Sequence, residues 1–358
     1  MTGPQPATQP ATWHDAARPG CAAGASALHL SMTRLAARAV VVAAILTVAV
    51  GCGGPPPPTP PVPAAEAPTT AIVFPPDVIT FQQDLAWSPD SRRIAFSLRA
   101  IPRDRWAELK YDALAGTQYD LYVVGADGRG LRQLTDDADD QLWASWLPDG
   151  RQLAYASTAG GKAAIFALRP DDPTPTPRAI TPPLADTADT AWSPDGQRVV
   201  YSAKVDAHSQ LYMATLIGTD VRQLTRDPFD HRGPVWSADG TALVFQGNPR
   251  GPGRDDIFVL HVATEVVTQV TNDDAGHIYP GWLPDGRVTF TVVDRDGRKR
   301  VVAQGRDPAA RETLVEGAFF ARVSPDGRAL AYILGAFPDA SIYIRPIDPA
   351  TKAIAIVE

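Results

Sequence analysis

The chain has 358 residues, a formal net charge of −7 and 44% hydrophobic residues. This composition is ordinary for a globular protein, and the acidic charge argues against nucleic acid as a partner. The only cysteines are Cys21 and Cys52, and Cys21 falls in a predicted leader, so we expect no disulfide bond in the mature chain.

The first residues have the composition of a processed segment. Residues 1–31 are rich in Ala, Pro and Gly and show no periodicity, so we interpret them as a disordered leader before the true start at Met32. Residues 32–51 combine a basic start with an apolar run, Ala39–Val50, which is too short to span a bilayer but suits a signal peptide. Cys52 follows directly.

Cys52 lies where a bacterial lipoprotein signal would be cleaved and lipidated. Ala49 occupies the position where such signals usually have Leu, so a plain signal peptide or an uncleaved anchor is the alternative. The next segment, 52–70, contains eight prolines and is expected to be a stiff, extended tether. We therefore predict an exported, lipid-anchored protein on the periplasmic side of a bacterial cell envelope.

From residue 71 to residue 358 the chain is organised by one repeated phrase. An aromatic residue, a tight turn of the Ser-Pro-Asp-Gly type and an apolar triplet recur six times. The copies begin at Trp87, Trp146, Trp192, Trp236, Trp282 and Val323. Pro, Asp and Gly in this order favour a turn between antiparallel strands. A spacing mostly in the forties indicates a repeat architecture.

Each copy is followed by two further strand-like runs, such as Asp120–Val123 and Arg132–Thr135 in the first repeat. Four antiparallel strands per repeat and six repeats predict an all-β fold, a six-bladed β-propeller. The six Asp-containing corners are expected to be structural, on one face of the disc. The links between blades are rich in aspartate and should lie on the other face.

The corner Trp192–Gly196, the run Asp120–Val123 and the run Arg132–Thr135 together resemble the repeats of the TolB-type propeller family. The resemblance covers about residues 80–346, without the N-terminal α/β domain of TolB. It is shared with the propellers of prolyl-oligopeptidase-type peptidases and with oligogalacturonate lyases. The resemblance implies docking onto a cell-envelope protein, including a peptidoglycan-associated one.

Two groups of residues are candidate sites. Blade one carries an insertion, residues 99–118, in which Arg105, Trp106 and Tyr111 could anchor a partner; the alternative is that it folds over the blade. Five positions before each repeat start, polar residues recur: Gln82, Gln141, Thr187, His231 and His277, with Ala318 in the sixth copy. We expect this set to ring the mouth of a water-filled central channel.

His231 and His277 in that ring leave metal binding open. No cofactor is predicted, with Ca²⁺ or a transition metal in the channel as the alternative. Closure of the ring has two candidates, the C-terminal run Ala353–Val357 and the N-terminal run Ala71–Phe74; we favour the C-terminal one, with the N-terminal strand packed alongside.

The sequence thus predicts a monomeric, membrane-tethered binding module for a cell-envelope protein. The alternative function is a metal-assisted, polysaccharide-active enzyme or a small-ligand binder at the channel mouth. Neither a Gly-x-Ser-x-Gly motif nor a Walker motif is present.

Overall fold

The computed structural model describes residues 70–109, 114, 116–157, 164–180, 187–215, 220–307, 310–335 and 340–347. In this part of the chain, six four-stranded antiparallel sheets follow one another around a ring. The prediction of a six-bladed β-propeller is confirmed. The predicted leader, signal peptide, Cys52 and the tether up to residue 69 lie outside the described residues.

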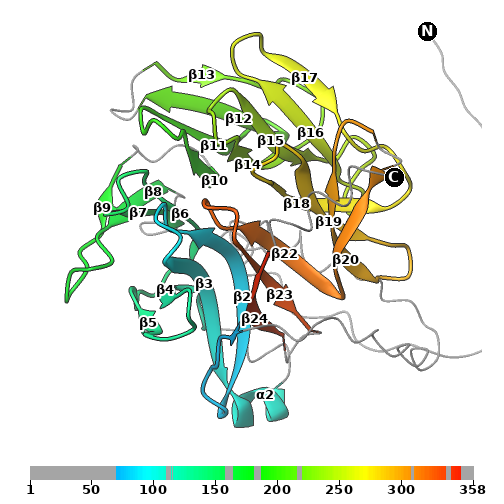
Figure 1. The fold of residues 1–358 in the computed structure, drawn as a ribbon. Coiled ribbons are helices and arrows are strands. Elements are labelled where there is room, and N and C mark those ends of the chain that lie inside the picture. Colours follow the sequence, from blue (N-terminus) through cyan, green and yellow to red (C-terminus); the bar gives the residue numbers. More distant parts are fainter. Residues whose placement is uncertain are drawn as a thin grey trace, which may run out of the picture. The chain divides into compact units, whose positions relative to one another are not determined.

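The blades follow the chain order (Figure 1). Blade one has β2 (Val78–Trp87), β3 (Arg93–Pro102), β4 (Asp120–Gly125) and β5 (Arg132–Gln133). Blade two has β6 (Gln141–Trp146), β7 (Leu153–Ser157), β8 (Ala164–Leu168) and β9 (Arg178–Ala179). Blade three has β10 (Thr187–Trp192), β11 (Arg198–Val205), β12 (His208–Thr215) and β13 (Arg222–Gln223).

Blade four has β14 (His231–Trp236), β15 (Ala242–Gly247), β16 (Asp256–His261) and β17 (Val266–Gln269). Blade five has β18 (Gly276–Trp282), β19 (Val288–Val293), β20 (Lys299–Gln304) and β21 (Glu312–Glu316). Blade six has β22 (Ala318–Val323), β23 (Ala329–Leu334), β24 (Ser341–Pro346) and β1 (Thr70–Ala71). The first described strand along the chain therefore belongs to the last blade.

The Asp of each corner serves the turn itself. In the first corner, Asp90 accepts hydrogen bonds from the Ser88 hydroxyl at 2.6 Å and from the Arg92 amide at 3.1 Å. The glycine that ends the third corner, Gly196, has a φ of 68°, a conformation that glycine adopts without strain. A Cβ atom there would lie 3.6 Å from Pro148 of the preceding blade. Consecutive corners thus pack against one another on this face, which we call the corner face.

In four of the six blades the tryptophan of the repeated phrase joins the blade to its predecessor. Its indole Nε1 donates to the carbonyl of the residue that precedes the repeat start one blade back. The distances are 3.0 Å from Trp87 to Arg322, 3.1 Å from Trp146 to Ala86, 3.1 Å from Trp236 to Ala191 and 3.0 Å from Trp282 to Val235. Trp192 is the exception, because its buried Nε1 has no hydrogen-bond partner.

A second bond crosses the seams closer to the ring axis. Each inner strand has a β-bulge with a positive φ three residues before the repeat start, for example at Asp84 and Gly233. In four blades the amide of the bulge residue donates to a side chain of the preceding blade. The pairs are Trp143 with Asp84, Gly233 with Asp189 at 3.2 Å, Tyr279 with Gln246 at 2.9 Å and Phe320 with Thr291 at 3.3 Å.

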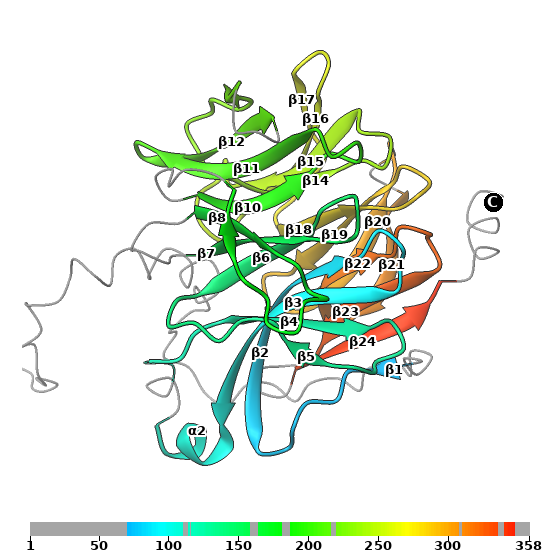
Figure 2. The same cartoon turned by 90° about the vertical axis from the view of Figure 1, so that its left-hand side faces the viewer.

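The N-terminal strand closes the ring, so our preference for the C-terminal run was wrong. β1 pairs with β24, with Thr70 opposite Ile344 and Ala71 opposite Tyr343 (Figure 2). Ile72 follows, donates its amide to the carbonyl of Ile342 at 2.9 Å, and is only 2% exposed. Residues 353–357 lie outside the described residues.

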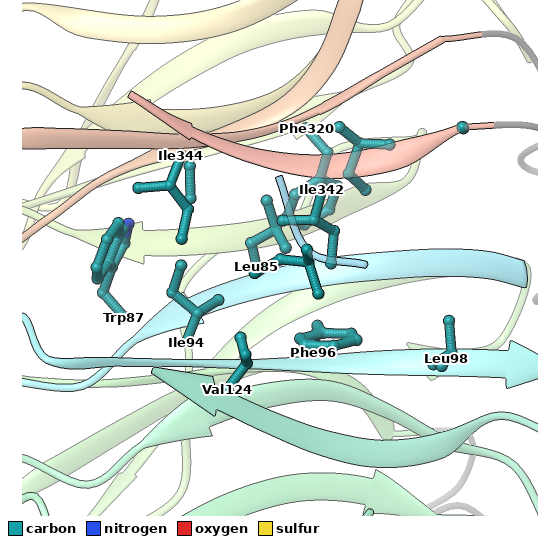
Figure 3. Close-up of a cluster of buried hydrophobic side chains, with 13 residues drawn as sticks. Leu85, Trp87, Ile94, Phe96, Leu98, Val124, Phe320, Ile342 and Ile344 are labelled. Atoms are coloured by element: carbon teal, nitrogen blue, oxygen red, sulfur yellow. The ribbon is translucent and has the colours of Figure 1, made fainter. Parts of the chain in front are cut away.

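Ile72 belongs to the hydrophobic cluster between blades six and one. Figure 3 shows its neighbours Phe96 and Ile94 from β3 facing Ile342 and Ile344 from β24. The β1 strand thus seals the ring because its apolar side chain packs against both the first and the last blade.

We expect Ile72→Ala to lower the free energy of unfolding by about 2–4 kcal/mol, because it removes a buried side chain from the closing seam. Val73, its neighbour, is 80% exposed. Val73→Ala should therefore change stability by less than about 0.5 kcal/mol. Urea unfolding of both variants checks this, and equal effects would contradict closure by β1.

The contribution of the indole hydrogen bond to stability can be measured by comparing two tryptophan variants. Trp87→Phe removes an indole that donates across a seam, whereas Trp192→Phe removes an equally buried indole that does not. Trp87→Phe should therefore cost about 1 kcal/mol more in unfolding free energy. Denaturant melts of the two variants, side by side, measure this difference; an equal loss at both sites means that the indole bond contributes little.

Candidate functional site

The predicted ring of polar residues lies inside the seams. Gln141, His231 and His277 are fully buried, and Gln82 is 7% exposed. Each side chain contacts the preceding blade: Gln82 donates to the Ala340 carbonyl at 3.1 Å, and Gln141 accepts from the Thr135 hydroxyl at 3.1 Å. The expectation of a water-lined ring was therefore wrong, because these residues lie on the inner strands and their side chains are buried in the seams. Thr187 begins β10.

His231 lies among aromatic rings. The ring centroids of Phe229, Phe245 and Phe258 are 4.8, 5.1 and 5.8 Å from that of the histidine, and its Nδ1 lies 3.4 Å from Oε1 of Gln210. Burial lowers the pKa of His231 to about 4, so the ring is neutral at pH 7. No group of three His, Cys, Asp or Glu side chains among the described residues could hold a metal. The metal site expected at His231 and His277 is therefore not found among the described residues.

His277 lies between two carboxylates at the seam of blades four and five. Its Nδ1 is 3.3 Å from Oδ1 of the fully buried Asp256, and its Nε2 is 3.1 Å from Oδ1 of Asp273. The Nε2 contact lacks hydrogen-bond geometry, so this buried atom has no hydrogen-bond partner. Asp256 also accepts from Thr271 at 3.0 Å and from Arg250 at 2.9 Å.

Asp273 connects this buried network to the surface. It forms an ion pair with Arg311 at 3.0 Å. Burial acts to raise the pKa of Asp273, but the hydrogen bond from the Ala275 amide and the electrostatic interactions with His277 and Arg311 outweigh it, and the pKa is lowered. The carboxylate is therefore ionised at neutral pH.

A cavity of about 330 Å³ opens above Asp273. Its charged lining is arranged in three ion pairs: Arg311 with Asp273, Arg295 with Asp274 at 2.6 Å, and Arg300 with Asp294. Arg295 and Asp274 are about three-quarters exposed. The sequence pattern pointed to His277 but missed the arginines, because they come from turns and strand ends that do not follow the repeat.

A group of buried and half-buried charged residues was also missed. Asp84 of blade one and Asp189 of blade three both interact electrostatically with Arg322 of blade six. Burial raises the pKa of Asp84 to about 7 and raises that of Asp189, and it lowers the pKa of Arg322 to about 10. Comparing the repeats at the bulge position would have revealed both aspartates.

The insertion of blade one extends the β2–β3 hairpin and ends in α2 (Arg103–Leu109), as Figure 1 shows. Trp106 is 8% exposed and packs against Ile79 and Ile101, with the Phe81 ring 5.8 Å away. Trp106 is thus not a surface anchor, because its ring completes a small core within the hairpin. Arg105 is half-buried, and Tyr111 lies outside the described residues.

No protein-family model matches the chain. The structure of TolB from Acinetobacter baumannii superposes with a TM-score of 0.56 at 16% identity, over 76% of this chain and 80% of that one. The chain has a TolB-like propeller fold. Among the described residues, no helix is long and apolar enough to span a membrane.

Sequence relatives agree with that fold. An uncharacterized protein of Agrobacterium fabrum is 27% identical over 214 residues, which are 57% of this chain and 68% of that protein. The Tol-Pal system protein TolB of Anaeromyxobacter dehalogenans is 26% identical over 120 residues, 33% of this chain and 26% of its own. Apart from the Agrobacterium protein, the curated relatives are spanned over only a part of their length, from 22% of an uncharacterized Bacillus subtilis peptidase to 54% of a Chlorobium luteolum TolB homolog.

The buried Asp84 predicts a pH dependence of stability. Because the folded state raises the pKa of Asp84 from 3.8 to about 7, its contribution is fully present below pH 4 and is lost as pH rises to about 7. Between pH 4 and pH 7 the free energy of unfolding of the wild type should fall by up to about 4 kcal/mol more than that of Asp84→Asn, which cannot titrate at this position. Urea unfolding of wild type and variant at pH 4 and pH 7 measures it; parallel pH profiles would show that Asp84 does not titrate as expected.

Proposed function

We propose that this protein is a binding module of the bacterial cell envelope. It docks onto an envelope protein through the face that carries the links between blades. Peptidoglycan-associated proteins are one class of such partners. The ion-paired cavity at the seam of blades four and five carries this proposal. The relatives named as TolB, one of them as a Tol-Pal system protein, support an envelope partner.

The charge pattern of the cavity suits a protein partner. Exposed ion pairs such as Arg295 with Asp274 contribute little to stability, so exchanging them for pairs with a partner costs little. Complementary charges at the rim of an interface then set its orientation and rate of association. His277 and Asp256 beneath the cavity hold Asp273 and Arg250 in place, and we assign them a positioning role.

The membrane anchor is part of the same proposal. A lipid on Cys52 and the proline-rich tether would hold the propeller away from the membrane surface. β1 begins at Thr70, the last residue of the predicted tether, so the anchor would connect to the strand that closes the ring. The protein is proposed to act as a monomer.

Photo-crosslinking in intact cells tests the surface and the anchor together. A photoreactive residue in place of Arg295 should capture an envelope protein, whereas the same residue in place of Val221, 52% exposed beside β13, should not. Asp274→Arg, which reverses one charge of the rim, should reduce capture about 2- to 5-fold. Cys52→Ala should release the protein into the soluble fraction.

Two results would count against the proposal. Equal capture at positions 295 and 221 would show that the cavity is not the interface. Retention of Cys52→Ala in the membrane fraction would show that Cys52 does not carry the anchor. Circular dichroism of each purified variant confirms that the propeller is folded.

A further inference from the structure

The seam between blades two and three differs from its neighbours. The tryptophan bond is absent there, since Nε1 of Trp192 has no partner. The bulge bond is absent too, because Ala156 occupies the position from which Gln246 and Thr291 bind a bulge amide in blades four and five. Apolar side chains, among them Leu147, Ile165 and Trp192, pack this seam instead.

A groove of about 600 Å³ opens on the corner face at this same seam. Its apolar part consists of Leu147, Pro148, Ala179 and Ile180. Asp149 and Asp195, from the corners of blades two and three, add carboxylates on both sides, against one guanidinium from Arg178. The groove is therefore apolar with a net negative rim.

The flanking seams show what fills this place elsewhere. Six residues after the repeat start, blade one has Arg93, whose guanidinium lies 4.5 Å from the ring centroid of Trp146 and donates to the Gly150 carbonyl at 3.2 Å. In blade three, Arg198 lies 4.9 Å from the Trp236 ring and 3.7 Å from Asp195. Both arginines reach across the corner face onto the next blade.

Blade two has Gln152 at this position, and Gln152 lines the groove. A glutamine is shorter than an arginine and carries no charge, so Asp149 lacks the cation that Arg198 supplies to Asp195 one blade later. Blades four and six have Ala242 and Ala329 there. The groove thus combines a missing guanidinium with carboxylates that would accept one.

We propose that this groove binds an extended segment of a partner protein that inserts an arginine side chain between aliphatic neighbours. The guanidinium lies beside the carboxylate of Asp149, as Arg198 lies beside Asp195, and beside the corner of the next blade, as Arg93 does. The aliphatic side chains of the segment pack on Leu147, Pro148 and Ile180. The site lies on the corner face, opposite the face of the proposed envelope interface, so the two can be tested independently.

Fluorescence polarisation with full-length protein in detergent micelles tests this. The probes are a fluorescein-labelled Gly-Leu-Arg-Leu-Gly peptide and the same peptide with citrulline in place of arginine. We expect the arginine peptide to bind about 2- to 5-fold more tightly, because citrulline keeps the shape and loses the charge. Asp149 is exposed, and Asp149→Asn should lower the affinity for the arginine peptide by a similar factor.

Substitution of Gln152 is the sharper test. Gln152→Arg places in the groove a guanidinium like those of the flanking blades. The affinity for the arginine peptide should therefore fall by more than about tenfold. Gln152→Ala leaves the groove open, so this variant should bind the arginine peptide as tightly as the wild type does. Thermal melting confirms folding; if Gln152→Arg is unfolded, Asp149→Asn and the citrulline peptide decide the question.

Three outcomes would overturn the proposal. They are no binding of the arginine peptide, equal affinity for the arginine and citrulline peptides, or undiminished binding to folded Gln152→Arg. Photo-crosslinking at Arg295 does not bear on any of them, because that residue lies at the blade four–five seam on the other face.

Discussion

The indole hydrogen bond that crosses four of the six seams is the contact on which the register of the propeller depends. A single blade cannot bury both of its faces, so the fold exists only if neighbouring blades stack in a fixed register. Apolar packing is not directional, whereas a bond from Trp236 Nε1 to the Ala191 carbonyl allows only one register. The bulge bond, as from Gly233 to Asp189, repeats this constraint nearer the axis.

These seam contacts decide where function can lie. Polar residues on the inner strands, His231 and His277 among them, are used to pair neighbouring blades and are buried. The axis holds buried charges whose pKa values are shifted by desolvation, as for Asp84. Charged side chains that are free of the repeat lie where it is interrupted, as at the arginine-lined cavity between blades four and five, and we therefore place the proposed partner contacts there.

The sequence predicted the architecture well because turn chemistry and strand alternation recur six times, and six weak signals in register support one another. It failed where the outcome depends on side-chain direction or on distant packing. His277 has the residue type of a metal ligand, but a buried orientation between Asp256 and Asp273. The choice between two closing strands depended on the fit of Ile72 against Phe96 and Ile342, which no local pattern encodes.

The seam between blades two and three is distinctive because it lacks both of these directional bonds. Where Trp192 and Ala156 make no bond across the seam, the register there depends on apolar packing and on the corners, such as Pro148 against Gly196. Selection for a rigid ring alone would favour an arginine at position 152, as in blades one and three. A glutamine above two corner carboxylates leaves stabilising interactions unused, and a partner's guanidinium can supply them.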